Sequence, residues 1–382
     1  MNGSSLSHKE FFSVKKLLVI APYQYLPYFS GGQKSIAQFL DYLGKETDLT
    51  VVGVPGNDAS LVKTYNLLPW LKTSSIPRYA DLSLVSKLVS LIKKEKFDAI
   101  IWEHPYYAWL ASIVKKRTAI KTILHIHNIE YQRFKSTGKW WWWIMKQYEK
   151  WFFNRADQIL FVSPEDKNFA VHEWKIPQDK CVEVAFGVEI RQFPTDKDGC
   201  RQMLKAKHSL GDDETLLLFN GLLDYKPNLD ALMIILNEIN PLLLKHEAFR
   251  YKIIICGKRL PQELNQLKNY ADKNVIYAGF VDDIEMYFKG VNVFLNPVQS
   301  GGGIKTKMVE SIAFGTTVIT TRTGASGIYQ NICGNKLIVV PDNEWNSFAK
   351  AIVNNSSKNE VTPPAYYEYY YWGNIVRKVI VS

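Results

Sequence analysis

The chain has 382 residues, of which 47% are hydrophobic and 22% are charged, a composition typical of a folded globular protein. A formal net charge of +10 suits anionic partners, but no nucleic-acid-binding motif accompanies it, so no nucleic acid partner is expected. No apolar stretch reaches the roughly 18 residues that a membrane span requires. The four scattered cysteines indicate reduced thiols, so we expect a cytoplasmic protein.

Short apolar runs alternate with helical patterns along the whole chain. Six strands are predicted in the first half, within residues 15–22, 49–56, 98–104, 122–128, 158–163 and 181–187. Six more are predicted in the second half, within residues 215–221, 251–257, 275–281, 291–297, 316–321 and 336–340. Most are continuous apolar runs, which indicates strands buried on both faces of a parallel sheet. The clearest helical patterns between them lie at 33–44, 83–95, 227–246 and 304–314.

The two sets of strands are separated by a polar stretch at 191–202, which contains a proline and a glycine and is typical of a linker. We therefore predict an α/β protein with two doubly wound, Rossmann-like domains, over residues 1–195 and 196–363. A last helical segment, 364–382, has no strand after it and is predicted to pack back on the first domain. Two such domains facing each other enclose a cleft lined by the carboxyl ends of their strands.

Three consecutive glycines, Gly301 to Gly303, lie between a predicted strand and a predicted helix. Without a Cβ, they allow an anion to approach the free N–H groups at the helix N-terminus. Lys305 and Lys307 add positive charge to the same place. The glycine-lysine-Ser/Thr order of a nucleoside triphosphate loop is absent. A flexible surface loop with solvated lysines is the alternative interpretation.

The glycine loop and its helix, PVQSGGGIKTKMVESIAFG, resemble the donor-site signature of the GT-B glycosyltransferases, specifically the retaining family four, or glycosyl transferases group 1. Other segments resemble that family in the same order: FSGGQKS, WEHPYYAW, ILHIHNIEYQRF, FGVEIRQF, FNGLLDYKPNLDAL, CGK and YAGFVDDIEMYF. The resemblance covers nearly the whole chain. It implies a GT-B fold, in which the second domain binds the donor and the first domain binds the acceptor.

The resemblance also implies an activity. It points to transfer of a sugar from a nucleoside-diphosphate sugar to a hydroxyl of a glycan or lipid-linked acceptor, with retention at the anomeric carbon. Family members of this kind build cell-surface polysaccharides and glycolipids. The nucleotide sugar is a co-substrate, and neither a cofactor nor a metal is expected.

Site roles follow from the same resemblance. In the family, the glutamate that closes the signature binds the ribose hydroxyls of the donor, and that residue is Glu310 here; a carboxylate suits a vicinal diol. The resemblance places His127 near the transferred sugar, and with Lys305 and Glu310 it forms the implied catalytic set. His104 and Asn128 are assigned to the acceptor side. The implied donor-binding residues are Gly31, Gly32, Gly221, Lys226, Lys258, Phe280, Val281, Gly301, Gly302, Gly303, Ile304, Lys305 and Glu310.

Structural roles are the alternatives for several of these residues. Histidines at strand ends often serve packing, and His125, which shares a strand face with His127 but lies deeper, is assigned to the core. The alternative interpretation of Glu310 is a residue on the helix surface that forms an ion pair with Lys307 of the same helix. The Asp-Lys-Asp sequence at 196–198 matches a metal motif of another glycosyltransferase fold, but it lies in the linker, so no metal is predicted.

The sequence departs from the family at the diphosphate and sugar contacts. Family members often carry a second glutamate eight positions before the first, where Gly302 stands here. An arginine and a lysine that hold the diphosphate correspond to Leu222 and Pro227. Because a leaving diphosphate needs compensating charge, we infer that Lys305, with Lys226 or Lys258, takes over. The identity of the donor sugar stays open.

A run of four tryptophans, Trp140–Trp143, lies in a predicted helix. Four consecutive helical positions span roughly 300° of the circumference, so at least one ring lies off the core face. The run is flanked by Lys135, Lys139, Lys146, Lys150 and Arg155. Exposed tryptophan beside basic residues is typical of an interfacial helix, which predicts docking on an anionic membrane at its inner face. Packing beneath the preceding loop is the alternative.

Two other functions remain open from the sequence. A non-catalytic GT-B scaffold that docks on a membrane or a partner is favoured by the missing diphosphate contacts at Leu222 and Pro227. A nucleotide-sugar epimerase of the same fold would also use Glu310, although its resemblance to the first domain is weaker. A dehydrogenase is disfavoured because no GxGxxG sequence follows any predicted strand.

Overall fold

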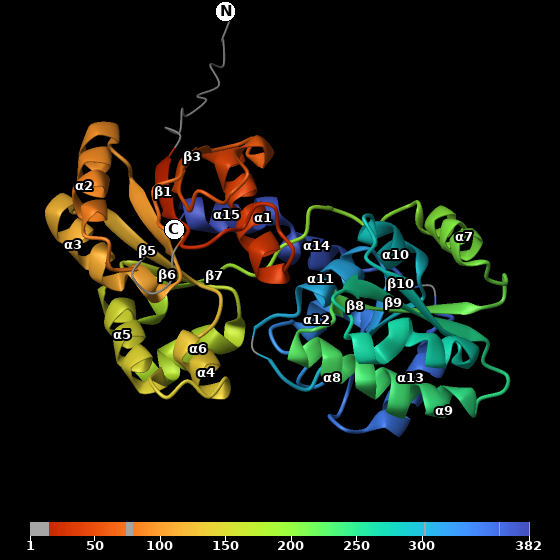
Figure 1. Ribbon diagram of the computed structural model, residues 1–382. Coiled ribbons are helices and arrows are strands. Elements are labelled where there is room, and N and C mark those ends of the chain that lie inside the picture. Colours follow the sequence, from red (N-terminus) through yellow and green to blue (C-terminus); the bar gives the residue numbers. More distant parts are fainter. Residues whose placement is uncertain (1–14, 74–78, 302, 359, 382) are drawn as a thin grey trace, which may run out of the picture.

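The computed structural model describes residues 15–73, 79–301, 303–358 and 360–381. Within them the chain forms two domains, each with a wholly parallel sheet and helices packed on its faces (Figure 1). The predicted pair of doubly wound domains is therefore confirmed.

The N-terminal domain has a seven-stranded sheet in the order β3-β2-β1-β4-β5-β6-β7. Its strands are β1 (Lys16–Ile20), β2 (Asp48–Val52), β3 (Asn66–Leu68), β4 (Ala99–Glu103), β5 (Lys121–Ile126), β6 (Gln158–Phe161) and β7 (Cys181–Glu183). Its helices are α1 (Gly31–Glu46), α2 (Ser83–Glu95), α3 (Ala108–Thr118), α4 (Glu130–Ser136), α5 (Trp142–Arg155) and α6 (Pro164–Trp174). The six predicted strands are present, and β3 is an addition whose three residues are too few to give a recognisable pattern.

The C-terminal domain has a six-stranded sheet in the order β10-β9-β8-β11-β12-β13. Its strands are β8 (Thr215–Leu222), β9 (Tyr251–Lys258), β10 (Val275–Gly279), β11 (Val293–Asn296), β12 (Thr317–Thr321) and β13 (Leu337–Val340). Its helices are α7 (Lys197–His208), α8 (Lys226–Ile234), α9 (Asn240–Leu244), α10 (Ile284–Gly290), α11 (Thr306–Ala313), α12 (Gln330–Cys333) and α13 (Trp345–Asn355). A π-helical turn, Ile235–Ile239, joins α8 to α9, so the predicted helix over 227–246 is continuous but irregular.

The strand orders place the points where ligands bind in such sheets. The order reverses between β1 and β4 in the first sheet and between β8 and β11 in the second. Open parallel sheets bind ligands beyond the carboxyl ends of strands at such reversals. The segments after β1, β4, β5, β8 and β11 carry most of the predicted site residues, so the topology brings them to one region between the domains.

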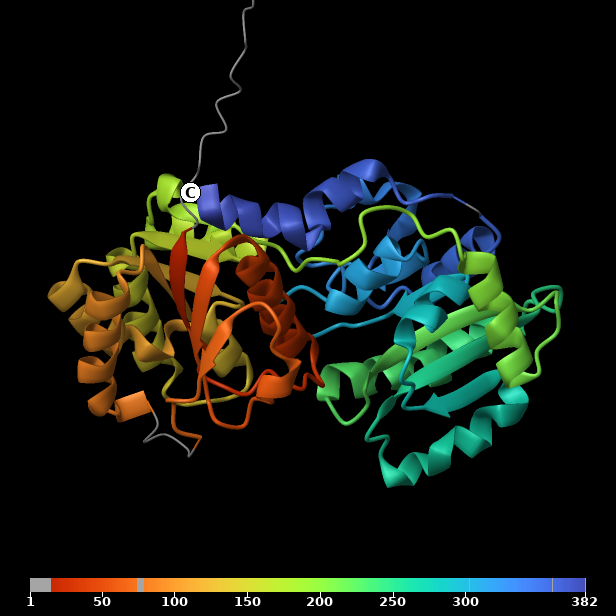
Figure 2. The ribbon, with the colours of Figure 1, turned by 90° about the horizontal axis from the view of Figure 1, so that it is seen from above.

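The C-terminal segment differs from the prediction. It forms two helices, α14 (Pro364–Tyr370) and α15 (Trp372–Val381), because Tyr371 between them is extended. Figure 2 shows these two helices running from one domain to the other. Helix α15 packs on the N-terminal domain, where the indole N–H of Trp372 donates to the side-chain oxygen of Gln38 at 3.0 Å. Helix α14 contacts both domains, and on the N-terminal side the hydroxyl of Tyr369 donates to the carboxylate of Glu183 in β7. In α14, the hydroxyl of Tyr366 donates to the carbonyl of Val309 in α11 at 2.7 Å.

The two connections between the domains are hydrogen-bonded to each other. The N–H of Val188, in the linker, donates to the carbonyl of Tyr370 at 2.6 Å, and the N–H of Trp372 donates to the carbonyl of Val188 at 3.0 Å. Glycine is required beside them, because a Cβ at Gly187 would lie 2.4 Å from the indole ring of Trp372. The linker and the C-terminal crossing therefore form one hydrogen-bonded pair of connections.

The tryptophan run is only partly helical, which corrects the expectation of four helical rings. Helix α5 begins at Trp142, and the two preceding tryptophans lie in a turn. Trp140 is 76% exposed and Trp143 is 54% exposed, whereas Trp141 packs on the ring of Phe134 at a centroid distance of 4.5 Å. The prediction that at least one ring lies off the core is confirmed. Among the described residues, we find no helix with the length and apolar character needed to cross a bilayer.

Candidate functional site

The two domains touch at the predicted donor loop. A Cβ at Gly303 would lie 2.6 Å from the side-chain oxygen of Asn128, which follows β5 in the other domain. Gly303 has a φ of +71°, so both its conformation and its space require glycine. The N–H of Gly327 in the C-terminal domain donates to the carboxylate of Glu165 at 2.9 Å. Asn128 and the glycine loop, both predicted from sequence, therefore meet; Gly302 lies outside the described residues.

Two helix N-termini converge at this junction. Helix α1 begins at Gly31 after the N-cap Ser30, whose side chain accepts from the N–H of Gln33. Helix α11 begins at Thr306, and a Cβ at Gly31 would lie 2.6 Å from the hydroxyl oxygen of Thr306. A Cβ at Gly32 would have no atom from elsewhere in the described chain within 4 Å, so the space beside this residue is open. Because the N-terminus of a helix carries partial positive charge and free N–H groups, the junction favours an anion.

Lys305 and Lys307 flank the start of α11 in different environments. The ammonium group of Lys305 donates to the carbonyls of Gly301 and Gly303 at 2.9 and 3.0 Å, so it is folded against its own loop. The ammonium group of Lys307 donates to the carbonyl of Asn220 at 2.6 Å, beneath the end of β8. Burial lowers the pKa of each lysine to about 8, against the opposing effect of nearby carboxylates.

Glycine is also required at the end of β8. A Cβ at Gly221 would lie 2.6 Å from the ammonium nitrogen of Lys307, so a larger residue would displace that side chain. Ile304 packs against Gly327, where a Cβ would lie 3.1 Å from the Ile304 side chain. These two predicted donor-side residues therefore support the loop through packing.

Glu310 is paired across the domain junction. Its carboxylate forms a short ion pair with Lys34 of α1, and the two side chains are 13% and 20% exposed. The alternative pairing with Lys307 is not the one observed, because the Lys307 ammonium donates to Asn220 instead. Lys34 was missed by sequence reasoning, since a lysine on an amphipathic helix is usually solvated.

The other predicted donor-side residues make separate contacts. The ammonium group of Lys258 lies 3.7 Å from the ring centroid of Phe280 and 5.1 Å from that of Phe29 in the N-terminal domain. Val281 is half-buried against the hydrophobic core. Lys226 is 82% exposed at its side chain and pairs with Asp230 on its own helix at 2.8 Å. Its role at the diphosphate stays a prediction, and its contacts are those of a solvated surface lysine.

A buried carboxylate at the end of β4 links two histidines at the end of β5. Glu103 lies 3.0 Å from Nδ1 of His125 and 2.7 Å from Nε2 of His127. Burial alone would raise the pKa of Glu103, but the two imidazoles outweigh it and hold that pKa well below its usual range. Burial lowers the pKa of His127, against the opposing effect of Glu103. His125, assigned to the core, is buried as expected and belongs to this hydrogen-bonded set.

A second carboxylate holds His104. Nδ1 of His104 lies 3.2 Å from Glu130 at the start of α4, and Nε2 lies 2.6 Å from the hydroxyl of Tyr23, which follows β1. Arg133 also binds the Glu130 carboxylate, with its Nε at 2.9 Å. Burial raises the pKa of Glu130, but His104 and Arg133 bring it down to about 2. The rings of His104 and His127 stack at a centroid distance of 4.7 Å, so both histidines belong to one cluster.

Glu149 supports this cluster from α5. Its carboxylate oxygens accept the N–H groups of Glu130 and Tyr131 at 2.9 and 3.1 Å and so cap the N-terminus of α4. Burial raises the pKa of Glu149 to about 8. Sequence reasoning missed Glu103, Glu130 and Glu149, although the Glu-His pair in WEHP was a signal that could have been followed.

The cluster also has metal-ligand chemistry. In the described part of the chain, Glu103, His125 and His127 form one group whose nitrogen and oxygen atoms lie within 4.8 Å of one another. Two ligands of one zinc ion at about 2.1 Å each would lie roughly 3.4 Å apart. The observed contacts of 2.7 and 3.0 Å are hydrogen-bond lengths instead. That neither a metal nor a cofactor is used stays a prediction.

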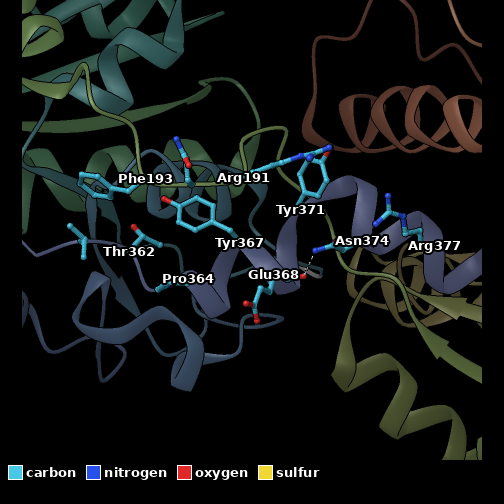
Figure 3. Close-up of a pocket in the computed structure, with 11 residues that line it drawn as sticks. Arg191, Phe193, Thr362, Pro364, Tyr367, Glu368, Tyr371, Asn374 and Arg377 are labelled. Atoms are coloured by element: carbon cyan, nitrogen blue, oxygen red, sulfur yellow. Dashed lines mark hydrogen bonds between the residues drawn. The ribbon is translucent and has the colours of Figure 1, made fainter.

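A groove of about 440 Å³ lies elsewhere, where the linker meets α14 and α15 (Figure 3). In Figure 3, the guanidinium of Arg191 lies beside Tyr371, and its Nη2 donates to the Tyr371 hydroxyl at 2.6 Å. None of the residues that line the groove is a predicted site residue, so it is distinct from the donor loop.

Two family models match the chain. Residues 29–192 match Glycosyltransferase Family 4, and residues 214–357 match Glycosyl transferases group 1. An uncharacterized 44.6 kDa protein in the cps region of Klebsiella pneumoniae is 25% identical over 291 residues, which cover 71% of this chain and 68% of that protein.

Solved structures share the whole fold. A glycosyltransferase from Rickettsia africae superposes with a TM-score of 0.71 at 17% identity and covers 97% of this chain and 98% of its own. Anabaena HepE in complex with UDP-glucose superposes with a TM-score of 0.66 at 13% identity and covers 96% and 98%. Because the two family models account for both domains and the fold agrees, the chain belongs to the GT-B glycosyltransferases of family 4, the glycosyl transferases group 1.

Proposed function

We propose that this glycosyltransferase moves a sugar from a nucleoside-diphosphate sugar to a hydroxyl of a glycan or lipid-linked acceptor, with retention. The observation that carries the proposal is the convergence of the α1 and α11 N-termini on the glycine loop, with Lys305 and Glu310 beside it. The cps-region relative supports a role in cell-surface polysaccharide synthesis, and the HepE complex supports a UDP-sugar donor.

The donor is proposed to lie on the C-terminal domain. Glu310 accepts hydrogen bonds from the ribose hydroxyls, and the diphosphate occupies the junction of the two helix N-termini. As the bond between the anomeric carbon and the diphosphate breaks, negative charge accumulates on the leaving oxygen. Lys305 and the N–H groups of the glycine loop then stabilise that charge more strongly than they stabilise the bound donor.

The acceptor is proposed to lie on the N-terminal domain, beside the histidine–carboxylate cluster. His127 is placed near the transferred sugar, and Glu103 fixes the orientation of its ring through the contact at Nε2. His104 and Asn128 lie at neighbouring strand ends on the same side. The acceptor hydroxyl passes its proton to the departing diphosphate oxygen as its own oxygen bonds to the anomeric carbon, and no residue of the chain forms a covalent intermediate in this scheme.

A peripheral membrane position is proposed as well. Trp140, Trp143 and Ile144 are exposed together at the start of α5, and lysines flank them. An apolar surface beside positive charge suits the interface of an anionic bilayer. Docking there would bring a lipid-linked acceptor to the inner membrane face, where such acceptors are found.

Calorimetry against UDP-, GDP- and ADP-sugars tests the proposal. Glu310→Ala should weaken binding of the preferred donor by about 30-fold, or roughly 2 kcal/mol, because two ribose hydroxyls lose their acceptor. Glu344→Ala, at an exposed glutamate of the same domain, is the matched control. Equal donor affinity in wild type and Glu310→Ala would refute the ribose role. Donor binding without turnover on any acceptor would favour the non-catalytic scaffold.

A further inference from the structure

Lys34 is held inside the domain junction rather than in solvent. It is the fourth residue of α1, and its ammonium group forms an ion pair with Glu310 of α11. Its side chain is only 20% exposed. Burial by itself lowers the pKa of Lys34, but Glu310 outweighs this effect and the net direction is upward.

The ion pair occupies the carboxylate that the donor is proposed to need. When Lys34 is paired with Glu310, Oε1 of the carboxylate is engaged before any ribose arrives, and a ribose diol bound by both oxygens needs that atom. A nucleoside must therefore displace Lys34 from Glu310, and the displaced ammonium would be left without its partner in a poorly hydrated place. Such a displacement is costly unless the incoming ligand supplies a new anion.

The position of Lys34 shows where that anion would lie. Gly31, one turn before it on α1, abuts Thr306 at the start of α11, so the two helix N-termini meet within reach of the Lys34 side chain. This is the proposed diphosphate site. A lysine has a flexible four-carbon stem, so its ammonium can move from a carboxylate to a neighbouring phosphate with its backbone fixed.

The diphosphate also lacks its usual cations in this chain. Leu222 and Pro227 stand where the family resemblance expects an arginine and a lysine. Of the three replacements predicted from sequence, Lys305 donates to carbonyls of its own loop, Lys226 is solvated and pairs with Asp230, and Lys258 lies over the ring of Phe280. Lys34 comes from the opposite domain and is already at the junction.

We propose that Lys34 is a donor-binding residue that exchanges partners. In the empty site it pairs with Glu310; when a nucleoside diphosphate binds, the ribose hydroxyls take Glu310 and the ammonium group of Lys34 pairs with the diphosphate. The inference rests on the proposed function of Glu310. The exchange makes the affinity for the ribose depend on the presence of phosphate. Because Lys34 and Glu310 lie in different domains, it also involves both domains in donor binding.

A crossover in affinities tests the exchange. Lys34→Met removes the cation, so binding of UDP, GDP or ADP should weaken by about tenfold or more. The same change frees Glu310, so binding of uridine, guanosine or adenosine should strengthen. The measured quantity is the ratio of the two dissociation constants, diphosphate against parent nucleoside, from calorimetry.

Matched variants separate this role from a structural one. Lys45→Met removes an exposed lysine from the same helix, where it pairs with Asp41, and should leave the ratio unchanged. Lys34→Arg keeps the charge and should retain the preference for diphosphates. If Lys34→Met does not fold, Lys34→Gln provides the same loss of charge with a polar side chain.

Three outcomes decide the proposal. A preference for the diphosphate that falls in Lys34→Met but not in Lys45→Met supports it. Equal losses for nucleoside and diphosphate, or no change in either, would overturn the role of Lys34 while leaving the proposed transferase function in place. A wild-type protein that binds none of the three diphosphates would instead refute the proposed function, and the exchange with it.

Discussion

The Nε2 atom of His127 lies 2.7 Å from a carboxylate oxygen of Glu103, and both side chains are buried at the ends of adjacent strands. The contact commits one ring nitrogen of His127 to the protein and leaves Nδ1 outside this hydrogen bond. A histidine held in this way has a fixed orientation and a proton affinity set by its neighbour. The pair therefore gives a specific expectation about what removing the carboxylate does.

Glu103→Gln should lower the pKa of His127 further, because the carboxylate opposes the effect of burial. It should also loosen the ring and reduce kcat by about tenfold, a change of roughly 1.4 kcal/mol in the barrier. Imidazole NMR titration and steady-state kinetics measure the two effects. Glu173→Gln, at an exposed residue of α6, is the control. An unchanged pKa of His127 would show that Glu103 does not tune it.

Glu149 should make stability depend on pH. The pKa of its carboxyl group is about 8 in the folded protein against 4.5 in an unfolded chain, so between these values the folded state binds a proton that the unfolded chain lacks. Stability from this group is therefore fully present below pH 4.5 and is lost as pH rises through 8. Urea unfolding across this range should show the loss in wild type and a flatter profile in Glu149→Gln. Parallel profiles would contradict the prediction.

Lys305→Ala should lower kcat by about 100-fold, the scale observed when one charge-stabilising group at a developing anion is removed. Lys305→Arg, which keeps the charge, should recover part of the rate. The measurement is kcat and KM with the preferred donor once it is identified. If kcat is unchanged and KM rises, Lys305 acts in donor binding and not on the leaving group.

Trp140 and Trp143 should carry membrane binding. Their replacement by serine should abolish sedimentation with anionic vesicles, while donor affinity is retained because neither tryptophan is among the proposed donor-binding residues. Wild-type binding should weaken as salt screens the flanking lysines, each contributing about 1 kcal/mol near an anionic surface. Trp345→Ser, in α13 of the C-terminal domain, is a control for tryptophan loss. If the wild-type protein does not bind anionic vesicles at low salt, the proposal of membrane docking is wrong, and the four tryptophans serve packing instead.

Both sheets were predictable because their strands are buried on both faces. Runs such as TLLLFNG and YKIIICG are continuous and apolar, and they became β8 and β9. The strand β3 has three residues and no such run, so its sequence carries too little signal. The break at Tyr371 was also hidden, because it depends on pairing with Val188, which lies far away in the sequence.

The candidate site was predictable where glycines or strand ends mark it. Gly303 and Asn128 were both named from sequence, and the structure brings them into contact. Lys34 and Glu130 were not, because each looks like an ordinary charged residue at the start of a helix. Their roles depend on partners from another domain or another strand, which local sequence does not specify.

The hydrogen-bonded pair of connections at Val188 and Trp372 has a consequence for the relative motion of the two domains. Two domains joined at two well-separated places would have a fixed relative orientation, and two domains joined by a single segment could reorient in many directions. Here the two connections are hydrogen-bonded side by side, so we expect them to act as one pivot, with a single easy rotation between the domains. With such a rotation we expect the contacts at the donor loop to break and re-form together. Cleavage of either connection should allow further relative motions of the two domains.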